Sequence, residues 1–250
     1  MGLRETEGIV LKSTDYRDTS RNIRVQTPDF GRISLIAKGV RKPKSKFSGN
    51  LEELNYISIA FYYKEDKDLF LLSQSDLLNS YRYIKEDFNK LVIGLAISEL
   101  VLRTEISRES NVPLFNLLLL VLKKLNEVKK NYLNMYIYFV ITFLKINGYQ
   151  IDFSKCLTCG KTETESRWYF SIKNGGIYCS SCHRNNLIIN AGMQKYLSKF
   201  SLWKIDRIPN VSIVKQEIRG ILNLLDKYMS YHIDGYKEPK SLEYLVKSYE

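Results

Sequence analysis

A chain of 250 residues with 44% hydrophobic and 26% charged residues has enough apolar material for a packed core, and its length favours two domains over one. No apolar run is long enough to span a membrane, and the N-terminus shows no apolar signal segment, so we expect a cytoplasmic protein whose thiols stay reduced. The formal net charge of +11 indicates an anionic partner. Residues 1–50 carry eleven Lys and Arg against five Asp and Glu, so more than half of the excess charge lies in the first fifth of the chain.

The first 75 residues follow the two-residue period of β-strands. Apolar or alternating stretches predict five strands, at residues 8–11, 21–26, 32–37, 55–63 and 69–72. Turn residues separate the second strand from the third, and a polar turn precedes the fifth. Five short strands in about seventy residues are typical of a small closed barrel of the OB kind, with an SH3-like barrel as the alternative.

A basic loop follows the third predicted strand. Five of the nine residues 38–46 are cationic and none is acidic, which suits contact with successive phosphates of a nucleic acid strand. A solvated charged loop is the alternative, but arginines on adjacent segments favour a nucleic-acid surface. The predicted nucleic-acid-binding residues are Arg17, Arg21, Arg24, Arg32, Lys38, Arg41, Lys42, Lys44 and Lys46.

From residue 83 onward the apolar residues recur at helical spacing. The pattern predicts helices at residues 85–106, 111–125 and 133–146, then at 193–200, 211–232 and 240–245. The first three are apolar almost all round and are expected to form the interior of a bundle. The sequence therefore predicts an α+β fold, with a barrel domain at residues 1–80 and a helical domain at 81–250.

All four cysteines lie within one short stretch, as two Cys-x-x-Cys pairs separated by nineteen residues: Cys156, Cys159, Cys179 and Cys182. This spacing is typical of a four-cysteine zinc site, and residues 168–178 between the pairs predict a β-hairpin that brings them together. We expect one structural zinc ion on a hairpin, residues 153–186, inserted in the helical domain. Four thiolates leave no open position on the metal, so His183 is expected to be a neighbour.

The cysteines have three alternative interpretations. Two disulfides would suit a secreted chain, and a redox Cys-x-x-Cys would need only one pair. Residues 179–183 also match the c-type haem attachment motif, although that interpretation ignores the first pair.

The sequence offers no candidate active site. The Asp-Phe-Gly at residues 29–31 lacks every other kinase motif, and there is no Gly-x-x-x-x-Gly-Lys-Ser/Thr phosphate loop. Only two histidines are present, and His232 falls in a predicted helix. We therefore expect a protein that is not an enzyme.

Several of these segments together resemble the RecO family of bacterial recombination mediators over essentially the whole chain. They are residues 8–12, 31–41 and 44–45, the paired cysteines with Gly175-Gly176, and Tyr231-His232. Residues 31–41 are the most specific piece. The resemblance implies an N-terminal OB domain, a helical domain and a zinc hairpin. It also implies binding to single- and double-stranded DNA, annealing of complementary strands, and loading of RecA together with RecR.

The resemblance further implies capture of the acidic, Phe-ending C-terminal tail of single-stranded-DNA-binding protein, and a location with the nucleoid. An apolar groove with a cationic rim would suit that tail, and helices at residues 122–130 were expected to supply it. The predicted tail-binding residues are Lys123, Lys124, Lys129 and Lys130. The alternative function is that of a zinc-ribbon protein that binds RNA or has a regulatory role.

Overall fold

The computed structural model describes residues 2–42, 45, 47, 49–104, 109–162, 166–183 and 187–248. The chain divides into two compact units, Met1–Glu127 and Val128–Glu250. Strands dominate the N-terminal part and helices the later part, so the predicted mixed α+β class is confirmed. The first compact unit therefore ends at residue 127. The predicted domain boundary at residue 80 is instead the point where the sequence pattern changes from strands to helices. Among the described helices, none has the length and apolar character that a membrane span requires.

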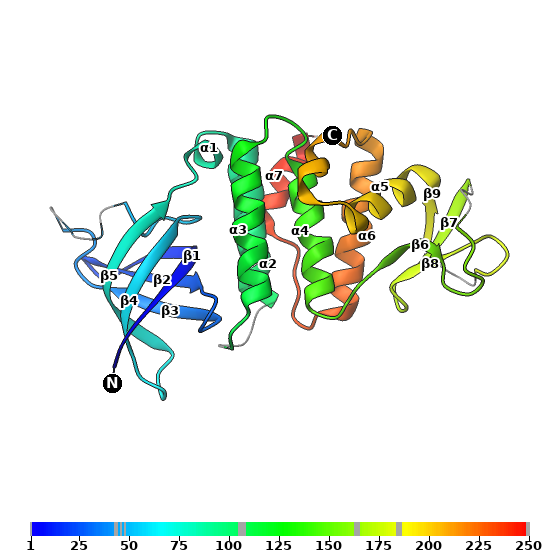
Figure 1. Cartoon of the computed structure of the whole chain (residues 1–250). Coiled ribbons are helices and arrows are strands. Elements are labelled where there is room, and N and C mark those ends of the chain that lie inside the picture. Colours follow the sequence, from blue (N-terminus) through cyan, green and yellow to red (C-terminus); the bar gives the residue numbers. More distant parts are fainter. Residues whose placement is uncertain are drawn as a thin grey trace. The chain divides into compact units, whose positions relative to one another are not determined.

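The first unit begins with five strands that close on themselves (Figure 1, blue to cyan). They are β1 (Gly2–Tyr16), β2 (Ser20–Gln26), β3 (Arg32–Ala37), β4 (Tyr56–Tyr63) and β5 (Leu69–Asn79). The order around the barrel is β1-β2-β3-β5-β4, in which β1 pairs antiparallel with both β2 and β4, and β3 pairs parallel with β5. All five predicted strands are present. β1 and β5 are longer than predicted because their polar ends still pair with neighbouring strands: the start of β1 and the end of β5 pair with β4, and the end of β1 pairs with β2.

Alternating apolar side chains of these strands fill the barrel, as the period of two requires. Ile23, Leu35 and Phe61 are fully buried there. Aromatic rings close one part of this core, since the Phe61 and Phe70 centroids lie 5.5 Å apart and Tyr63 stacks on Phe70 at 5.1 Å. The interior is therefore packed with side chains, and any ligand must bind the outer surface or the loops.

Three helices complete the first unit: α1 (Arg82–Lys85), α2 (Phe88–Thr104) and α3 (Val112–Glu127). The predicted helix at 85–106 is interrupted before Phe88. The Asp87 carboxylate accepts hydrogen bonds from the backbone of Asn89 (2.9 Å) and Lys90 (3.2 Å) and so starts a new helix. The predicted end of that helix, residue 106, lies outside the described residues. α2 and α3 both pack against β1.

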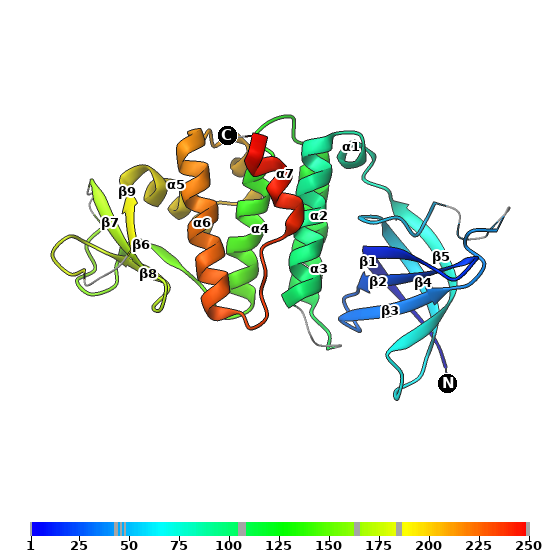
Figure 2. The same ribbon diagram turned by 180° about the vertical axis from the view of Figure 1, so that it is seen from behind.

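The second unit contains a small sheet and five helical segments (Figure 2). In chain order they are α4 (Leu133–Ile146), β6 (Asp152–Cys156), β7 (Arg167–Ser171), β8 (Gly176–Tyr178), β9 (Leu187–Asn190), α5 (Ala191–Leu202), η1 (Ile205–Asn210), α6 (Lys215–His232) and α7 (Lys240–Ser248). α4 has the predicted bounds, and β7 and β8 form the predicted hairpin. The sheet order is β6-β8-β7-β9, and α5 packs against β6, β7 and β9. His232 is engaged as a structural residue, because its Nε2 lies 2.7 Å from the Ile172 carbonyl oxygen.

Candidate metal centre and nucleic-acid interface

The four cysteine side chains meet at one point. Cys156 ends β6, Cys179 follows β8, and the second cysteine of each pair comes three positions further on. All four sulfur atoms lie within 4.8 Å of one another, and none is in a disulfide. Zinc ligands about 2.3 Å from a tetrahedral ion lie about 3.8 Å from each other. The measured Cys159 Sγ–Cys179 Sγ distance of 3.7 Å fits that geometry, so this group could hold a metal ion.

Backbone hydrogen bonds shape both cysteine turns. Gly160 N donates to Cys156 O (2.9 Å), and Gly160 has the positive φ of 72° that the turn requires. In the second turn, the backbone N–H groups of Cys182 and His183 both donate to Cys179 O at 3.1 Å. Cys156 lies opposite Ile177 of the neighbouring parallel strand, which brings the two turns to the same edge of the sheet.

The protein environment already favours a thiolate in this cluster. Burial raises the pKa of the Cys156 thiol, but backbone hydrogen bonds in the two turns outweigh it and lower the pKa to about 6. Hydrogen bonds to the sulfurs of Cys179 and Cys159 raise the pKa of Cys182 to about 12. A cation would therefore meet a ready thiolate at Cys156 and would bind Cys182 by displacing its proton.

His183 lies beside the cluster. Its Nδ1 is 2.7 Å from Ser180 O, and its ring stacks on Tyr169 with centroids 3.5 Å apart and planes at 10°. Both contacts hold the imidazole in place by groups other than the sulfurs. This agrees with the expectation that four thiolates suffice.

The predicted basic residues of the barrel differ in whether their side chains are exposed or held in ion pairs. Arg24 on β2, and Lys38 and Lys42 in the loop after β3, are exposed. Arg21 and Arg41 share one carboxylate, since Asp15 Oδ1 lies 2.9 Å from Arg21 Nε and Asp15 Oδ2 lies 3.5 Å from Arg41 NH1. The remaining loop residues, Lys44 and Lys46, lie outside the described residues.

Two further arginines have conformations set by their neighbours. Arg17 lies in the turn between β1 and β2 with φ 52°, and its guanidinium lies 5.2 Å from the Tyr16 ring. Arg32 turns toward the helices of the first unit and donates through NH1 to Leu102 O (2.5 Å) and Val101 O (3.4 Å). These carbonyls belong to the C-terminal end of α2, where the helix dipole is negative. Arg32 therefore has a structural role that the sequence did not reveal.

Strand register places one further cation, Lys12, beside the predicted basic residues. Lys12 on β1 lies directly opposite Arg24 on β2, so both side chains project from the same face. Lys12 is ion-paired with Glu53 at 3.3 Å. No local signal marks Lys12, because its position beside Arg24 depends on the pairing of two strands.

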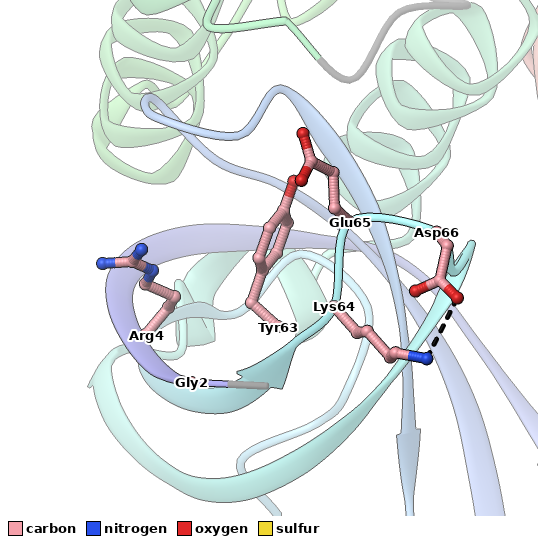
Figure 3. A pocket seen from close by; sticks show the side chains of 6 residues that line it. All are labelled: Gly2, Arg4, Tyr63, Lys64, Glu65 and Asp66. Atoms are coloured by element: carbon pink, nitrogen blue, oxygen red, sulfur yellow. Dashed lines mark hydrogen bonds and ion pairs between the residues drawn. The ribbon is translucent and has the colours of Figure 1, made fainter.

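A second feature of the barrel is a pocket of about 660 Å³ between the start of β1 and the β4–β5 loop (Figure 3). Arg4, Tyr63 and Lys64 line it together with Glu65 and Asp66. Lys64 turns toward Asp66, 3.0 Å away, whereas Arg4 does not. The two carboxylates of this pocket balance its two cations, Arg4 and Lys64, which disfavours a polyanion, so the nucleic-acid surface is better sought around Arg24.

The predicted tail-binding lysines are not all on one helix. α3 ends at Glu127, two residues beyond the predicted end at 125, and Lys129 and Lys130 follow it in the second unit. In the last turn of α3, Asn126 O accepts a hydrogen bond from the buried Lys90 ammonium (3.2 Å), which satisfies one of the carbonyl groups at the helix end. Lys124 is ion-paired with Glu127 at 3.8 Å.

Of the four predicted tail-binding lysines, Lys123 borders a pocket beside α3. The pocket holds about 550 Å³ and is lined by Leu119, Leu120 and Lys123 of α3, and by Tyr56 and Leu78 of the barrel. Leu78 and Leu120 are 46% and 44% exposed, which leaves apolar surface open to solvent. A largely apolar groove bordered by a lysine thus exists, although Glu127 also lines it and it involves one of the four predicted residues.

Known proteins match the whole chain. Residues 1–81 match the family model for the N-terminal domain of recombination protein O, and residues 85–243 match the model for its C-terminal domain. Neither description names a catalytic activity. The DNA repair protein RecO of Mycoplasma mycoides is 32% identical over 235 residues, which cover 91% of this chain and 90% of the relative. The RecO of Bacillus pumilus is 28% identical over 250 residues, 97% of this chain and 96% of the relative.

A barrel of basic character joined to helices and a cysteine-bearing hairpin defines a class of recombination protein, and both family models fall in that class. The chain belongs to the RecO family, which confirms the resemblance seen in the sequence.

Proposed function

We propose that this chain is a non-enzymatic DNA-binding protein of recombinational repair, which binds single- and double-stranded DNA and anneals complementary strands. The observation that carries the proposal is the set of exposed cations on β2 and in the loop after β3 of a five-stranded barrel, in a chain of the RecO family. We assign the barrel to the OB type. Barrels of that type bind oligonucleotides across strands 2 and 3 and through the loop between strands 1 and 2.

The chemistry of this face suits sequence-independent binding. Arg24, Lys38 and Lys42 offer exposed positive charges, which attract phosphates without reading base edges. Phosphate neutralisation on two strands reduces the repulsion that slows annealing. No covalent step is required, and DNA binding would place the protein with the nucleoid.

We propose that the metal is a single zinc ion held by Cys156, Cys159, Cys179 and Cys182. Four sulfur donors at the spacing given above fit a closed tetrahedral shell, which is typical of structural zinc. When bound, the ion would supply a crosslink between the two cysteine turns and hence folding free energy. Its effect on DNA binding would then be through the stability of the second unit.

The proposed partners are RecR, with which the protein would load RecA onto coated strands, and the C-terminal tail of single-stranded-DNA-binding protein. For the tail, the groove bordered by Lys123 offers apolar surface for a Phe side chain and a cation for a carboxylate. We retain Lys124, Lys129 and Lys130 as candidates for long-range attraction of the acidic tail.

A salt titration tests the DNA surface. If about four to six phosphates are neutralised, the slope of log affinity against log salt for single-stranded DNA is about −3 to −4, at about −0.7 per contact. Replacing Arg24, Lys38 and Lys42 by Ala should flatten the slope by about 2 and weaken binding similarly for unrelated sequences. Arg82→Ala is the matched control, because Arg82 is an exposed arginine on α1.

An unchanged slope in the triple variant would show that the barrel face does not bind DNA. A competition experiment addresses the RNA-binding alternative. A protein that reads the shape of structured RNA should prefer a folded RNA over an unstructured single strand of DNA.

A further inference from the structure

Aromatic and cationic side chains alternate along one half-buried side of α5 and the residue that follows it. Tyr196, Lys199 and Trp203 follow one another at intervals of three and four residues, so they form one stripe along the helix. Lys199 Nζ lies 6.0 Å from the centre of the Tyr196 ring and 5.0 Å from that of Trp203. The adjoining face of α5 is buried through Leu197 and Phe200, so the stripe lies at the edge of the buried face and its residues are half-buried.

The chain then turns back and adds a second cation to the same stripe. η1 carries Arg207, whose guanidinium carbon lies 5.9 Å from the centre of the Trp203 ring. Trp203 therefore has a cation from α5 and a cation from η1 within reach. Lys204 and Arg207 are exposed, and Trp203 itself is half-buried. The tryptophan is thus anchored by packing and still presents part of its ring to solvent.

The positive charges of this stripe are not neutralised locally. In the part of the chain that the structure describes, no carboxylate pairs with Lys195, Lys199, Lys204 or Arg207. Asp206 is the one acidic residue between positions 191 and 210. The barrel differs, because there Asp15 neutralises part of the charge of Arg21 and Arg41. The second unit therefore offers cations that, like Arg24, Lys38 and Lys42 of the barrel, are not held by a carboxylate among the described residues.

The relative strength of two interactions decides what can replace the cations over the ring. A base stacked on an aromatic side chain is bound more strongly than a cation held over the ring at an exposed site. A nucleobase can therefore displace Lys199 or Arg207 from Trp203. The displaced amine or guanidinium stays close enough to bind the phosphate of the same nucleotide.

We propose that Tyr196, Lys199, Trp203 and Arg207 form a second binding surface for single-stranded DNA, in which bases stack on Trp203 and phosphates contact the cations. The choice of DNA as ligand rests on the proposed function. The surface is on the second unit and is separate in sequence from the barrel residues. Annealing requires two strands on one protein, and two surfaces on one chain would supply a place for each.

Tryptophan fluorescence provides a direct test because the chain has two tryptophans in different environments. Trp168 is 0% exposed, whereas Trp203 lies in the stripe. Titration of the full chain with oligo(dT), with excitation selective for tryptophan, should quench emission as bases stack on Trp203. Trp203→Phe should lose the quenching, and Trp168→Phe should retain it.

Affinity measurements extend the test. Trp203→Ala should weaken oligo(dT) binding by about fivefold or more, as expected for the loss of one stacked base. Replacing Lys199 and Arg207 by Ala should lower the salt slope by about 1.4. Lys227→Ala removes a charge from the exposed side of α6 and should change neither quantity.

The outcomes separate this proposal from the barrel proposal. If both hold, the triple variant of Arg24, Lys38 and Lys42 binds more weakly but still shows quenching at saturation. Oligonucleotide binding without any change in tryptophan emission, and with full affinity in Trp203→Ala, would overturn the α5 surface alone and leave the stripe as a contact for another protein. A complete absence of oligonucleotide binding would overturn both.

Discussion

The sulfur atoms of Cys159 and Cys179 lie 3.7 Å apart, although the two residues are twenty positions apart in the chain. A disulfide bond requires about 2.05 Å, so this pair has the spacing of two ligands on one ion. Cys159 belongs to the first turn and Cys179 to the second, which makes this distance a measure of how the hairpin closes. A metal crosslink at this point would join β6 to the hairpin of β7 and β8.

Removal of one ligand should therefore destabilise the second unit. We expect one zinc per chain in protein purified without chelators, and less than that in Cys159→Ser. The free energy of unfolding should fall by at least about 2 kcal/mol, since metal binding and folding are coupled in such sites. Metal analysis and thermal unfolding measure the two effects. Ser181→Ala is the control, because Ser181 is exposed between two cysteines.

Thiol counting in the purified protein distinguishes the remaining alternatives. Four reactive thiols with no bound metal would contradict the zinc site. A mass lower by two hydrogens per bridge would indicate disulfides, and covalently attached haem would be visible by its absorbance.

Replacement of Asp15 is expected to strengthen DNA binding, unlike replacement of the cations. Its carboxylate holds both Arg21 and Arg41. Asp15→Asn should release both guanidinium groups for phosphates and increase affinity for single-stranded DNA about two- to fivefold at low salt, with a smaller gain at high salt. Stability should change little, because exposed ion pairs contribute about 0–1 kcal/mol. Asp66→Asn, in the β4–β5 loop, tests whether any lost carboxylate has the same effect.

If Asp15→Asn and Asp66→Asn raise affinity equally, the gain reflects net charge and not the release of Arg21 and Arg41. Filter binding at two salt concentrations would decide between the two explanations.

Arg32 should behave differently from the other predicted DNA contacts. Its donors go to the carbonyls of Val101 and Leu102, so Arg32→Ala should lower the free energy of unfolding by about 1–2 kcal/mol. The DNA affinity of the folded variant should change less than that of Arg24→Ala. Urea unfolding and a binding titration on the same preparations measure both. A large loss of affinity with unchanged stability would return Arg32 to the DNA surface.

The sequence predicted those features that local pattern determines. The four cysteines and α4 are examples, because ligand spacing and a helical apolar period are both visible in a single stretch. The role of Arg32 could not be predicted, since its partners Val101 and Leu102 are about seventy residues away in the chain. The pairing of Arg21 with Asp15 likewise depends on the register of β1 and β2.

Short elements were missed for a related reason. β6 buries only Phe153 and Cys156, and β9 buries only Ile189, which is too little to establish a period. The α5 stripe was missed because its two ends come from different elements. Trp203 and Arg207 approach each other only after the chain turns from α5 into η1.

Tyr81 provides a test of the packing between the barrel and its helices in the first unit. It is 3% exposed, and burial raises its pKa from the ordinary value of 10.0 to about 12. The folded chain thus keeps the phenolic proton at a pH where the unfolded chain has lost it. The stability that Tyr81 contributes is complete below about pH 10 and is lost as pH rises through about 12.

Tyr81→Phe removes this titration. Relative to the variant, the native chain should lose about 2 kcal/mol of stability between pH 9 and pH 12, at about 1.4 kcal/mol per pKa unit. Tyr83→Phe is the matched control, since Tyr83 is 62% exposed two residues away. Urea unfolding at pH 9 and pH 11.5 measures the difference in each protein. An equal loss of stability in the native chain and in Tyr81→Phe would mean that Tyr81 reaches solvent, and that the strand β5 and helix α1 on either side of it pack more loosely than the structure shows.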